Sequence, residues 1–448
     1  MSTLIDHSAQ KFGVRTFASA QTELPKLLMV AHYCSPDKGS DWWVGWSRAL
    51  QAAEHFRVWV VTSTQSRPDI ERFIERNGPI PNLTFVYQGL DPAGRLFSRI
   101  PVSFLYVNPF SYGSWQKQAA KLAKRLHSEH CFDLTHHVNL LGFREPGTLW
   151  ELDVPFIWGP IGGTQFCPWK FLGTAGLADF VKEAGRSAAN WLQLRYSRKV
   201  HRALKNAAVV LVANSDGKRQ LGRYRPDSIQ LLETGLDFVR AKRTNGAPGQ
   251  PLRILWSGEI QFRKALHLLL QAVAQIRGTI DFELRILGKG AGLKKAQAMA
   301  QKLGLSEKCR FLGWIPLEDA REQSTWADVF VFTSLRDTSG NVMLEAMSRG
   351  VPVITFDHQG AGDIVTSESG IKIPVTSPAD AVNRLSDAIA ALAKDREWLA
   401  RLSQGAALRA EHFLWQRNAA AMAKVYRSAL KTRTIRRAQP IPARDVAA

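Results

Sequence analysis

FTSLRDTSGNVMLEAMSRG, residues 332–350, is the stretch of sequence that decides the fold. Residues 328–333 (DVFVFT) are apolar and β-prone, which predicts a buried parallel strand. Residues 334–341 are polar and include a glycine, as is typical of a loop, and residues 342–349 have the apolar spacing of a helix. A strand, a loop and a helix in this order direct backbone N–H groups and the positive end of the helix to one point, where anions bind. The stretch therefore predicts an α/β fold with an anion site at this turn.

Two carboxylates flank the predicted anion site. Asp337 lies in the loop, and Glu345 follows in the predicted first turn of the helix. Carboxylates are poor ligands for phosphate but good acceptors for the hydroxyl groups of a sugar. This combination suits a nucleotide-sugar, with backbone amides for the diphosphate and carboxylates for the ribose and the hexose. Taken alone, Glu345 is equally explained as an acid favoured by the helix dipole and Asp337 as a turn residue.

The pattern Asp337-x7-Glu345 followed by AMSRGVPVI resembles the Glu-x7-Glu motif of the family 4 retaining glycosyltransferases and their EAMA-G-PV run. The chain differs in having Asp as the first acid and Asn341 where the family usually has an apolar residue. The resemblance implies a GT-B fold, in which two Rossmann-like, doubly wound domains face each other across a cleft. It also implies that Glu345 binds the ribose and Asp337 a sugar hydroxyl, while Gly340, Asn341 and Val342 belong to the donor site.

Two domains are expected, because 448 residues are too many for one ordinary core. A strand, turn, helix and second strand over residues 26–62 give the βαβ order of a doubly wound sheet, and this order restarts at residue 252. We expect a loose leader (1–25), an acceptor-side domain (26–239), a linker (240–251), a nucleotide-sugar-binding domain (252–412), a terminal helix that crosses back to the first domain (413–430) and a basic disordered tail (431–448).

A turn with two cations follows the predicted strand 252–257. Gly258 opens the turn, and Arg263 and Lys264 begin the next helix. A guanidinium can fork onto phosphate oxygens and an ammonium adds a mobile point charge, so the pair is suited to a diphosphate. The segment resembles the G-R-…-RKG element of the family, with Glu259 where many members carry an additional Arg. The alternative is that both cations are ordinary charges on a helix surface.

The first domain offers two further candidate positions. Gly39 and Ser40 follow the first strand at the edge where open α/β sheets bind ligands, although a plain βα turn explains them as well. Residues 132–137 (FDLTHH) predict a strand whose end presents His136 and His137. The resemblance implies that Gly39 and Ser40 face the donor phosphates and that one histidine touches the donor sugar. The spacing fits either histidine, and a structural role is the alternative.

The net charge of +20 calls for a polyanionic partner. Residues 169–205 mix aromatic side chains with Lys and Arg, a composition that lies well on an anionic membrane surface, although an ordinary helix pair with long cationic stems is the alternative. No nucleic acid is expected, because the chain shows no RNA-binding or helix-turn-helix signature. No signal peptide or apolar run of 18 residues is visible, and the four cysteines are scattered, so we expect a cytoplasmic protein on the inner face of the membrane.

The sequence therefore predicts a retaining hexosyltransferase that uses a UDP- or GDP-linked donor. We expect its acceptor to be a lipid-linked saccharide in surface polysaccharide or glycolipid synthesis. Arg263 and Lys264 would stabilise the leaving diphosphate, and no cofactor or metal is expected because no Asp-x-Asp occurs. The resemblance implies retention by front-face attack. The alternatives are a nucleotide-sugar epimerase of the same architecture, a basic nucleic-acid-binding protein, and a nicotinamide oxidoreductase suggested by residues 288–292 (GKGAG), which do not open the first βαβ unit.

Overall fold

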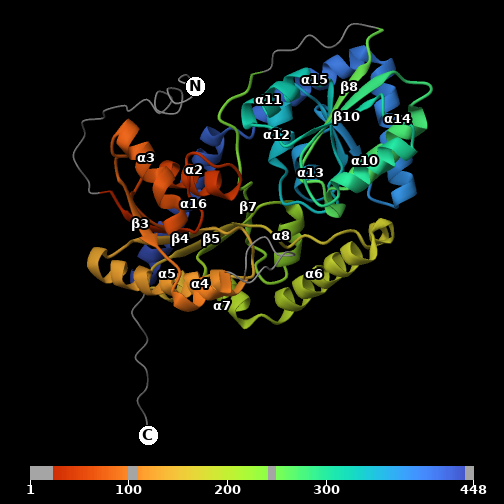
Figure 1. Cartoon of the computed structure of the whole chain (residues 1–448). Coiled ribbons are helices and arrows are strands. Elements are labelled where there is room, and N and C mark those ends of the chain that lie inside the picture. The colour runs from red at the N-terminus through yellow and green to blue at the C-terminus, as the bar shows by residue number, and fades with distance from the viewer. Residues whose placement is uncertain (1–23, 99–108, 241–248, 439–448) are drawn as a thin grey trace. The chain divides into compact units, whose positions relative to one another are not determined.

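A computed structural model describes residues 24–98, 109–240 and 249–438 of the chain (Figure 1). The chain divides into two compact units. The first unit comprises residues 1–140, 147–157 and 425–448, and the second comprises residues 141–146 and 158–424. The predicted leader and linker lie largely outside the described residues, and the predicted domain boundaries remain a prediction.

The first half of the chain alternates strands with helices, as the sequence predicts. Its elements are β1 (Lys26–Ala31), α2 (Asp41–Ala53), β2 (Arg57–Ser63), η1 (Thr64–Ser66), α3 (Arg67–Asn77), β3 (Leu83–Gln88), α4 (Pro92–Ser98), α5 (Pro109–His130), β4 (Leu134–Asn139), η2 (Leu149–Glu151), β5 (Phe156–Ile161), η3 (Trp169–Thr174), α6 (Leu177–Tyr196), α7 (Arg198–Asn206), β6 (Val209–Val212), α8 (Ser215–Leu221) and β7 (Ile229–Gln230).

The second half repeats this alternation. Its elements are β8 (Leu252–Ser257), η4 (Phe262–Lys264), α9 (Leu266–Ile276), β9 (Phe282–Leu287), α10 (Leu293–Lys302), β10 (Cys309–Gly313), α11 (Leu317–Trp326), β11 (Val329–Phe332), α12 (Asn341–Met347), β12 (Val353–Phe356), α13 (Gln359–Ile364), β13 (Gly370–Ile373), α14 (Pro378–Lys394), α15 (Arg396–Glu411) and α16 (Trp415–Ala438). Helix α16 takes in residues 431–438, which the sequence predicts to be part of a disordered tail.

The strands form two parallel sheets, which confirms the predicted α/β class. The strand order is β3-β2-β1-β4-β5-β6-β7 in the first sheet and β10-β9-β8-β11-β12-β13 in the second. In both sheets the strand order reverses beside the first strand of the sheet, between β1 and β4 and between β8 and β11. On the two sides of this point the chain proceeds toward opposite edges of the sheet. Ligands of open α/β sheets bind at such a point, beyond the carboxyl ends of the strands.

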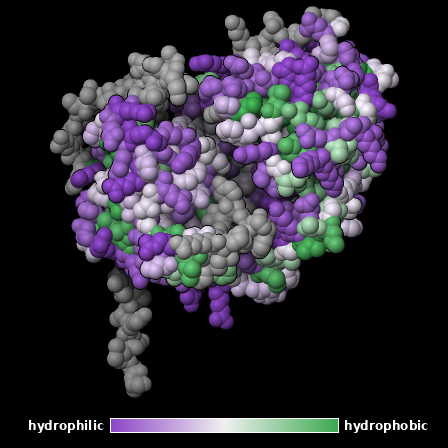
Figure 2. Space-filling view, viewed as in Figure 1, coloured by the Kyte–Doolittle hydropathy of each residue, from purple (hydrophilic) through white to green (hydrophobic). Residues whose placement is uncertain are grey.

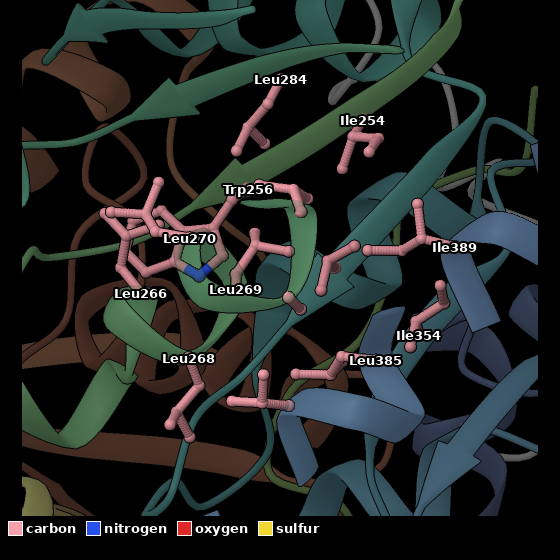
Figure 3. Packing of buried hydrophobic residues seen from close by; sticks show 14 of the residues in the cluster. Ile254, Trp256, Leu266, Leu268, Leu269, Leu270, Leu284, Ile354, Leu385 and Ile389 are labelled. Atoms are coloured by element: carbon pink, nitrogen blue, oxygen red, sulfur yellow. The ribbon is translucent and has the colours of Figure 1, made fainter. Parts of the chain in front are cut away.

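The second sheet is buried on both faces, which explains why its strands are almost continuously apolar. All four residues of β11 are buried, and helices cover the sheet on both sides (Figure 1). Leucines of α9 pack beneath Ile254 and Trp256 of β8, next to Leu385 and Ile389 of α14 (Figure 3). Ser377 and Asp395 cap the N-termini of α14 and α15, respectively. Each side chain accepts a hydrogen bond from the backbone N–H group three residues later. This packing gives the loops beyond β8 and β11 a rigid support.

Candidate donor-binding site

The loop between β11 and α12, residues 333–340, forms the centre of the candidate site. It ends at Gly340, which precedes α12 with a φ of 87°, a left-handed conformation that favours glycine. A Cβ at this position would lie 2.9 Å from the side chains of both Met343 and Phe332. The amide of Leu335 donates a hydrogen bond of 2.7 Å to the carbonyl of Arg263 and thereby ties this loop to the turn after β8. The first residues of α12, Asn341 and Val342, follow Gly340 directly, so the predicted strand–loop–helix turn is present.

Three of the predicted site residues contact one another. The ammonium of Lys264 forms an ion pair with the carboxylate of Asp337, and the guanidinium of Arg263 lies 3.8 Å from the same carboxylate. Arg263 also donates a hydrogen bond of 3.1 Å to the carbonyl of Arg336. The side chains of Arg263, Lys264 and Asp337 are 22%, 12% and 24% exposed, so a ligand can reach all three. The structure thus brings a carboxylate suited to a hydroxyl next to two cations suited to phosphate.

The charges of this cluster stabilise one another. Burial alone would raise the pKa of Asp337, but Lys264 and Arg263 outweigh burial and lower the pKa, so the carboxylate is ionised at neutral pH. Burial lowers the pKa of Lys264, while Asp337 acts in the opposite direction. The ammonium of Lys264 also lies 5.0 Å from the ring centroid of Phe332, at the end of β11. An ionised Asp337 can accept a hydrogen bond from a hydroxyl group of a bound sugar.

Side chains that the sequence analysis does not single out hold the loop in place. The backbone N–H of Asp337 donates a hydrogen bond of 2.8 Å to the amide oxygen of Gln359, whose nitrogen donates to the carbonyl of Phe166 at 2.9 Å. The side-chain nitrogen of Asn214 donates to the carbonyl of Thr338 at 2.7 Å. These partners are more than 20 residues away in sequence. No local sequence pattern indicates them.

A buried ion pair joins the same loop to α6. The guanidinium of Arg336 donates two hydrogen bonds to Glu183, at 2.9 Å and 3.0 Å, and the two side chains are 15% and 5% exposed. Burial would raise the pKa of Glu183, but the hydrogen bonds and the charge of Arg336 lower it overall. Glu183 is an acid within the otherwise basic stretch 182–205 of the sequence. Its position as a single acid in a basic segment is the sequence feature that could have indicated a buried ion pair.

Glu345 lies in α12 apart from this ion-pair cluster. Helix α12 begins at Asn341, one residue earlier than predicted, so Glu345 falls beyond its first turn. The interpretation of Glu345 as a first-turn acid is therefore wrong. Burial raises the pKa of Glu345, and the charges of Arg321 and Arg349 only partly oppose this effect. A partly buried carboxylate whose charge is this poorly compensated is suited to receive hydroxyl donors from a ligand.

The glycines of residues 288–292 have a structural role. The amide of Gly258 donates to the carbonyl of Leu287, and the amide of Ile260 donates to the carbonyl of Lys289. A Cβ on Gly288, whose φ is 139°, would lie 1.9 Å from the carbonyl oxygen of Gly258. A Cβ on Gly258 itself would meet only an ordinary contact of 3.5 Å. The close backbone approach therefore accounts for Gly288 without dinucleotide binding.

The two candidate histidines belong to the first unit and differ in their surroundings. Strand β4 continues to Asn139, which pairs with Ala31, so both histidines lie inside the strand and not at its end as predicted. Nδ1 of His136 lies 2.9 Å from the hydroxyl of Tyr426, and the ring is fully buried. His137 points to the opposite face, and neither of its ring nitrogens has a hydrogen-bond partner among the described residues. Burial lowers the pKa of His137 to about 4, so its ring is neutral at pH 7.

Gly39 and Ser40 also lie in the first unit, immediately before α2. Both are exposed, and Ser40 has a φ of 60° with no side-chain hydrogen bond to the helix. The carbonyl of Ser40 accepts a hydrogen bond of 3.1 Å from the amide of Val44, which starts the helix. The predicted βα turn is present, and its part in donor binding remains a prediction.

Two features of the described residues concern metals and membranes. Within residues 24–98, 109–240 and 249–438, no group of three or more His, Cys, Asp or Glu side chains is placed to hold a metal ion. No helix in the same ranges is both long enough and apolar enough to span a bilayer. The independence of the reaction from metal therefore remains a prediction.

Comparisons with known proteins agree with this fold. The structure is similar to sucrose-phosphate synthase from Thermosynechococcus elongatus, with a TM-score of 0.65 and 19% identity over 91% of this chain and 100% of that chain. It is also similar to Alr3699/HepE from Anabaena in complex with UDP and glucose, with a TM-score of 0.59 and 15% identity over 90% and 100% of the two chains. At these identities the likeness shows the fold, and the two parallel sheets therefore define the class as GT-B.

The sequence matches a known family and known relatives over part of its length. Residues 237–409 match the family described as Glycosyl transferases group 1. It is 32% identical to D-inositol 3-phosphate glycosyltransferase of Streptomyces bingchenggensis, over 50% of this chain and 54% of the relative. It is 27% identical to a putative colanic acid biosynthesis glycosyltransferase, WcaL, of Salmonella typhimurium, over 36% and 42% of the two chains. The chain thus spans about half the length of the curated relatives it matches.

Proposed function

We propose that this protein is a retaining glycosyltransferase that transfers a hexose from a UDP- or GDP-linked donor to a lipid-linked saccharide at an anionic membrane surface. The observation that carries the proposal is the cluster of Arg263, Lys264 and Asp337 next to the Gly340 turn. It combines cations for a diphosphate with an ionised acceptor for a sugar hydroxyl. The match of residues 237–409 to the group 1 family and the similarity to a structure in complex with UDP and glucose support the same class of donor.

The chemistry of the reaction follows from the charges of this cluster. When the bond between the sugar and the diphosphate breaks, the leaving group gains negative charge and the sugar becomes oxocarbenium-like. Arg263 and Lys264 stabilise the leaving diphosphate, together with the backbone amides that follow Gly340. Asp337 orients the sugar through a hydroxyl group, and Glu345 binds the ribose. The neutral ring of His137 retains both a donor and an acceptor nitrogen, as hydrogen bonding to a hydroxyl group requires.

Helix α6 supports the membrane part of the proposal, because its polar and apolar faces are reversed. Its inward face carries four polar side chains, Glu183, Arg186, Asn190 and Gln193, and the buried apolar Leu194 beside them. Each of the four makes hydrogen bonds within the second unit. An ordinary surface helix instead turns an apolar stripe inward.

The outward face of α6 carries an apolar stripe. The exposed members of the stripe are Leu177 (81%), Phe180 (44%), Val181 (61%), Trp191 (54%), Leu192 (50%) and Tyr196 (62%). Hydrophobic residues also reach the surface toward the bottom of the view in Figure 2, where Figure 1 shows α6 and α7. Lys182 and Arg195 lie next to members of the stripe in sequence, so the partner that this surface fits is an anionic bilayer.

The donor part of the proposal is tested with a panel of nucleotide-sugars. The purified protein is incubated with each UDP- or GDP-hexose and a bacterial membrane extract, and released nucleoside diphosphate is measured. We expect release with one donor, dependent on the extract. Interconversion of the sugar without the extract would indicate the epimerase. No release with any donor and no binding of UDP or GDP would refute the transferase.

The membrane part is tested separately by flotation with vesicles. We expect binding to vesicles that contain phosphatidylglycerol, weaker binding at high salt, and little binding to phosphatidylcholine alone. The double variant Trp191→Ser, Leu192→Ser removes apolar area from the stripe, so its vesicle affinity should fall at least about tenfold. Leu408→Ser is the matched control, because Leu408 of α15 is 63% exposed but lies outside the stripe. Equal loss in both variants would contradict a specific role for α6.

A further inference from the structure

Arg186 on the inward face of α6 is poorly satisfied. Its Nη2 lies 3.4 Å from the carbonyl oxygen of Gly163, a long hydrogen bond. Its Nε is buried and has no hydrogen-bond partner among the residues that the structure describes. A guanidinium has five N–H donors, and leaving a buried one unpaired is costly. Arg186 therefore has hydrogen-bonding capacity that a ligand can use.

The charges around Arg186 are mostly of its own sign. Burial contributes most to lowering the pKa of Arg186, and Arg336 and Arg144 contribute next, so that the pKa falls to about 9. Glu183 is a carboxylate that opposes these effects, but it is already engaged with both guanidinium nitrogens of Arg336. At neutral pH the side chain remains charged. Its surroundings therefore favour the arrival of an anion.

Arg144 is oriented toward the same region without being neutralised. Its Nε donates a hydrogen bond of 2.5 Å to the side-chain oxygen of Gln193, and its Nη2 donates to the side-chain oxygen of Asn190. Both acceptors lie on the inward face of α6, within two turns of Arg186. Because amide oxygens carry no net charge, they fix the guanidinium in position but leave its positive charge available.

These two arginines extend the cation pair of the donor site. Arg263 is close enough to Arg186 to affect its pKa, and Arg336 affects the pKa of Arg144 as well. The cluster contains five cations (Arg144, Arg186, Arg263, Lys264 and Arg336) and three carboxylates (Glu183, Asp337 and the exposed Glu259), which leaves a surplus of two positive charges. The diphosphate of a nucleotide-sugar carries about two negative charges and gains one when it leaves.

We propose that Arg186, with Arg144 beside it, forms an anion subsite for a phosphoryl group, continuous with the Arg263 and Lys264 site. The proposal rests on the function proposed above and adds a third arm to its phosphate site. The phosphoryl group comes from the donor diphosphate or from a phosphate on the acceptor. In the first case Arg186 acts most strongly on the leaving diphosphate. The turn after β8 offers this diphosphate only two cations, because Glu259 stands where many members of the family carry an additional Arg.

The test uses the full chain and the variants Arg186→Gln, Arg186→Lys and Arg401→Gln. Titration calorimetry measures the affinities for UDP, GDP and inorganic pyrophosphate. A hydrogen bond to a charged group is worth enough that we expect Arg186→Gln to weaken diphosphate binding about ten- to a hundredfold, with partial rescue in Arg186→Lys. Arg401→Gln makes the same charge change at an exposed position of α15, and we expect wild-type affinity. Circular dichroism checks that each variant is folded.

A second measurement separates the two sources of the phosphoryl group. The wild-type protein is saturated with UDP and then titrated with inorganic phosphate. If the subsite serves the donor diphosphate, UDP occupies it and no phosphate binds. If it serves the acceptor, phosphate binds in the presence of UDP and this binding is lost in Arg186→Gln.

The outcomes also separate this inference from the proposed function. The subsite is overturned if Arg186→Gln is folded, binds UDP, GDP and pyrophosphate with wild-type affinity, and binds inorganic phosphate as the wild-type protein does. The proposed transferase function is unaffected by that result. Wild-type protein that binds neither UDP nor GDP would overturn both.

Discussion

Replacing Glu183 with glutamine tests how strongly α6 supports the donor loop. Glu183 is 5% exposed and accepts two short hydrogen bonds from Arg336, which lies in the loop between β11 and α12. Removing one partner of a buried ion pair costs about 3–5 kcal/mol, because the other charge stays buried and unpaired. Glutamine keeps one acceptor oxygen, which recovers about 1 kcal/mol, so we expect the free energy of unfolding to fall by about 2–4 kcal/mol. The positive charges of Arg186 and Arg263 nearby favour the upper part of this range.

The assay is calorimetric unfolding of the full chain, with UDP affinity measured in parallel. The transition of the second unit should move down by several degrees, and UDP affinity should fall because Arg336 is released. Glu129→Gln is the matched control. The side chain of Glu129 is 53% exposed and lies 3.7 Å from Arg125, so its replacement should change the free energy of unfolding by less than about 0.5 kcal/mol. The pKa of Glu183 is lowered by folding, so its contribution is present at neutral pH and is lost as the pH falls through the folded pKa. A Glu183→Gln variant as stable as Glu129→Gln would refute this reasoning.

Three further predictions follow from the described residues. His32 and His137 have pKa values lowered to about 3 and about 4, so the unfolded chain binds more protons below about pH 6.5. Urea unfolding should therefore show the first unit losing stability between about pH 6.5 and about pH 4, and less steeply in His137→Gln; an unchanged slope would contradict this. Glu345→Gln should weaken UDP-sugar binding at least about tenfold while leaving the free protein equally or more stable, because it removes a poorly compensated, partly buried charge; calorimetry that finds full affinity would remove Glu345 from the site. Gly340→Ala should cost about 1–3 kcal/mol, whereas Gly173→Ala, with open space around it, should cost little; equal unfolding midpoints would exclude strain at Gly340.

The features that sequence predicts correctly are those that depend on neighbouring residues. The apolar run of β8 and the strand, loop and helix after residue 328 appear almost as expected, because buried parallel strands and helix ends are specified locally. Arg263 and Lys264 also depend only on a turn between a strand and a helix. Lys264 and Asp337 are 73 residues apart, so no local pattern predicts that they form an ion pair. They meet because both of their loops lie at the same edge of the sheet.

The features that sequence misses depend on contacts between distant segments. Glu183 and Arg336 are 153 residues apart, and His136 and Tyr426 are 290 residues apart. Hydrophobic periodicity locates α6 but not the direction in which its apolar face points, since the same pattern fits a stripe turned inward or outward. The exposed fractions of the stripe, together with the polar contacts of Asn190 and Gln193, establish that the stripe is turned outward.

The reversed faces of α6 have a practical consequence for handling the purified protein. In plain buffer the stripe stays exposed among the residues that the structure describes, and large exposed apolar patches promote aggregation. We therefore expect concentrated samples to form soluble oligomers or precipitate, and mild detergent micelles to restore the monomer. The same inward polar contacts limit the remedy, because α6 cannot be deleted without leaving Arg336 and Arg144 unpaired, so solubility is better improved by polar substitutions along the stripe.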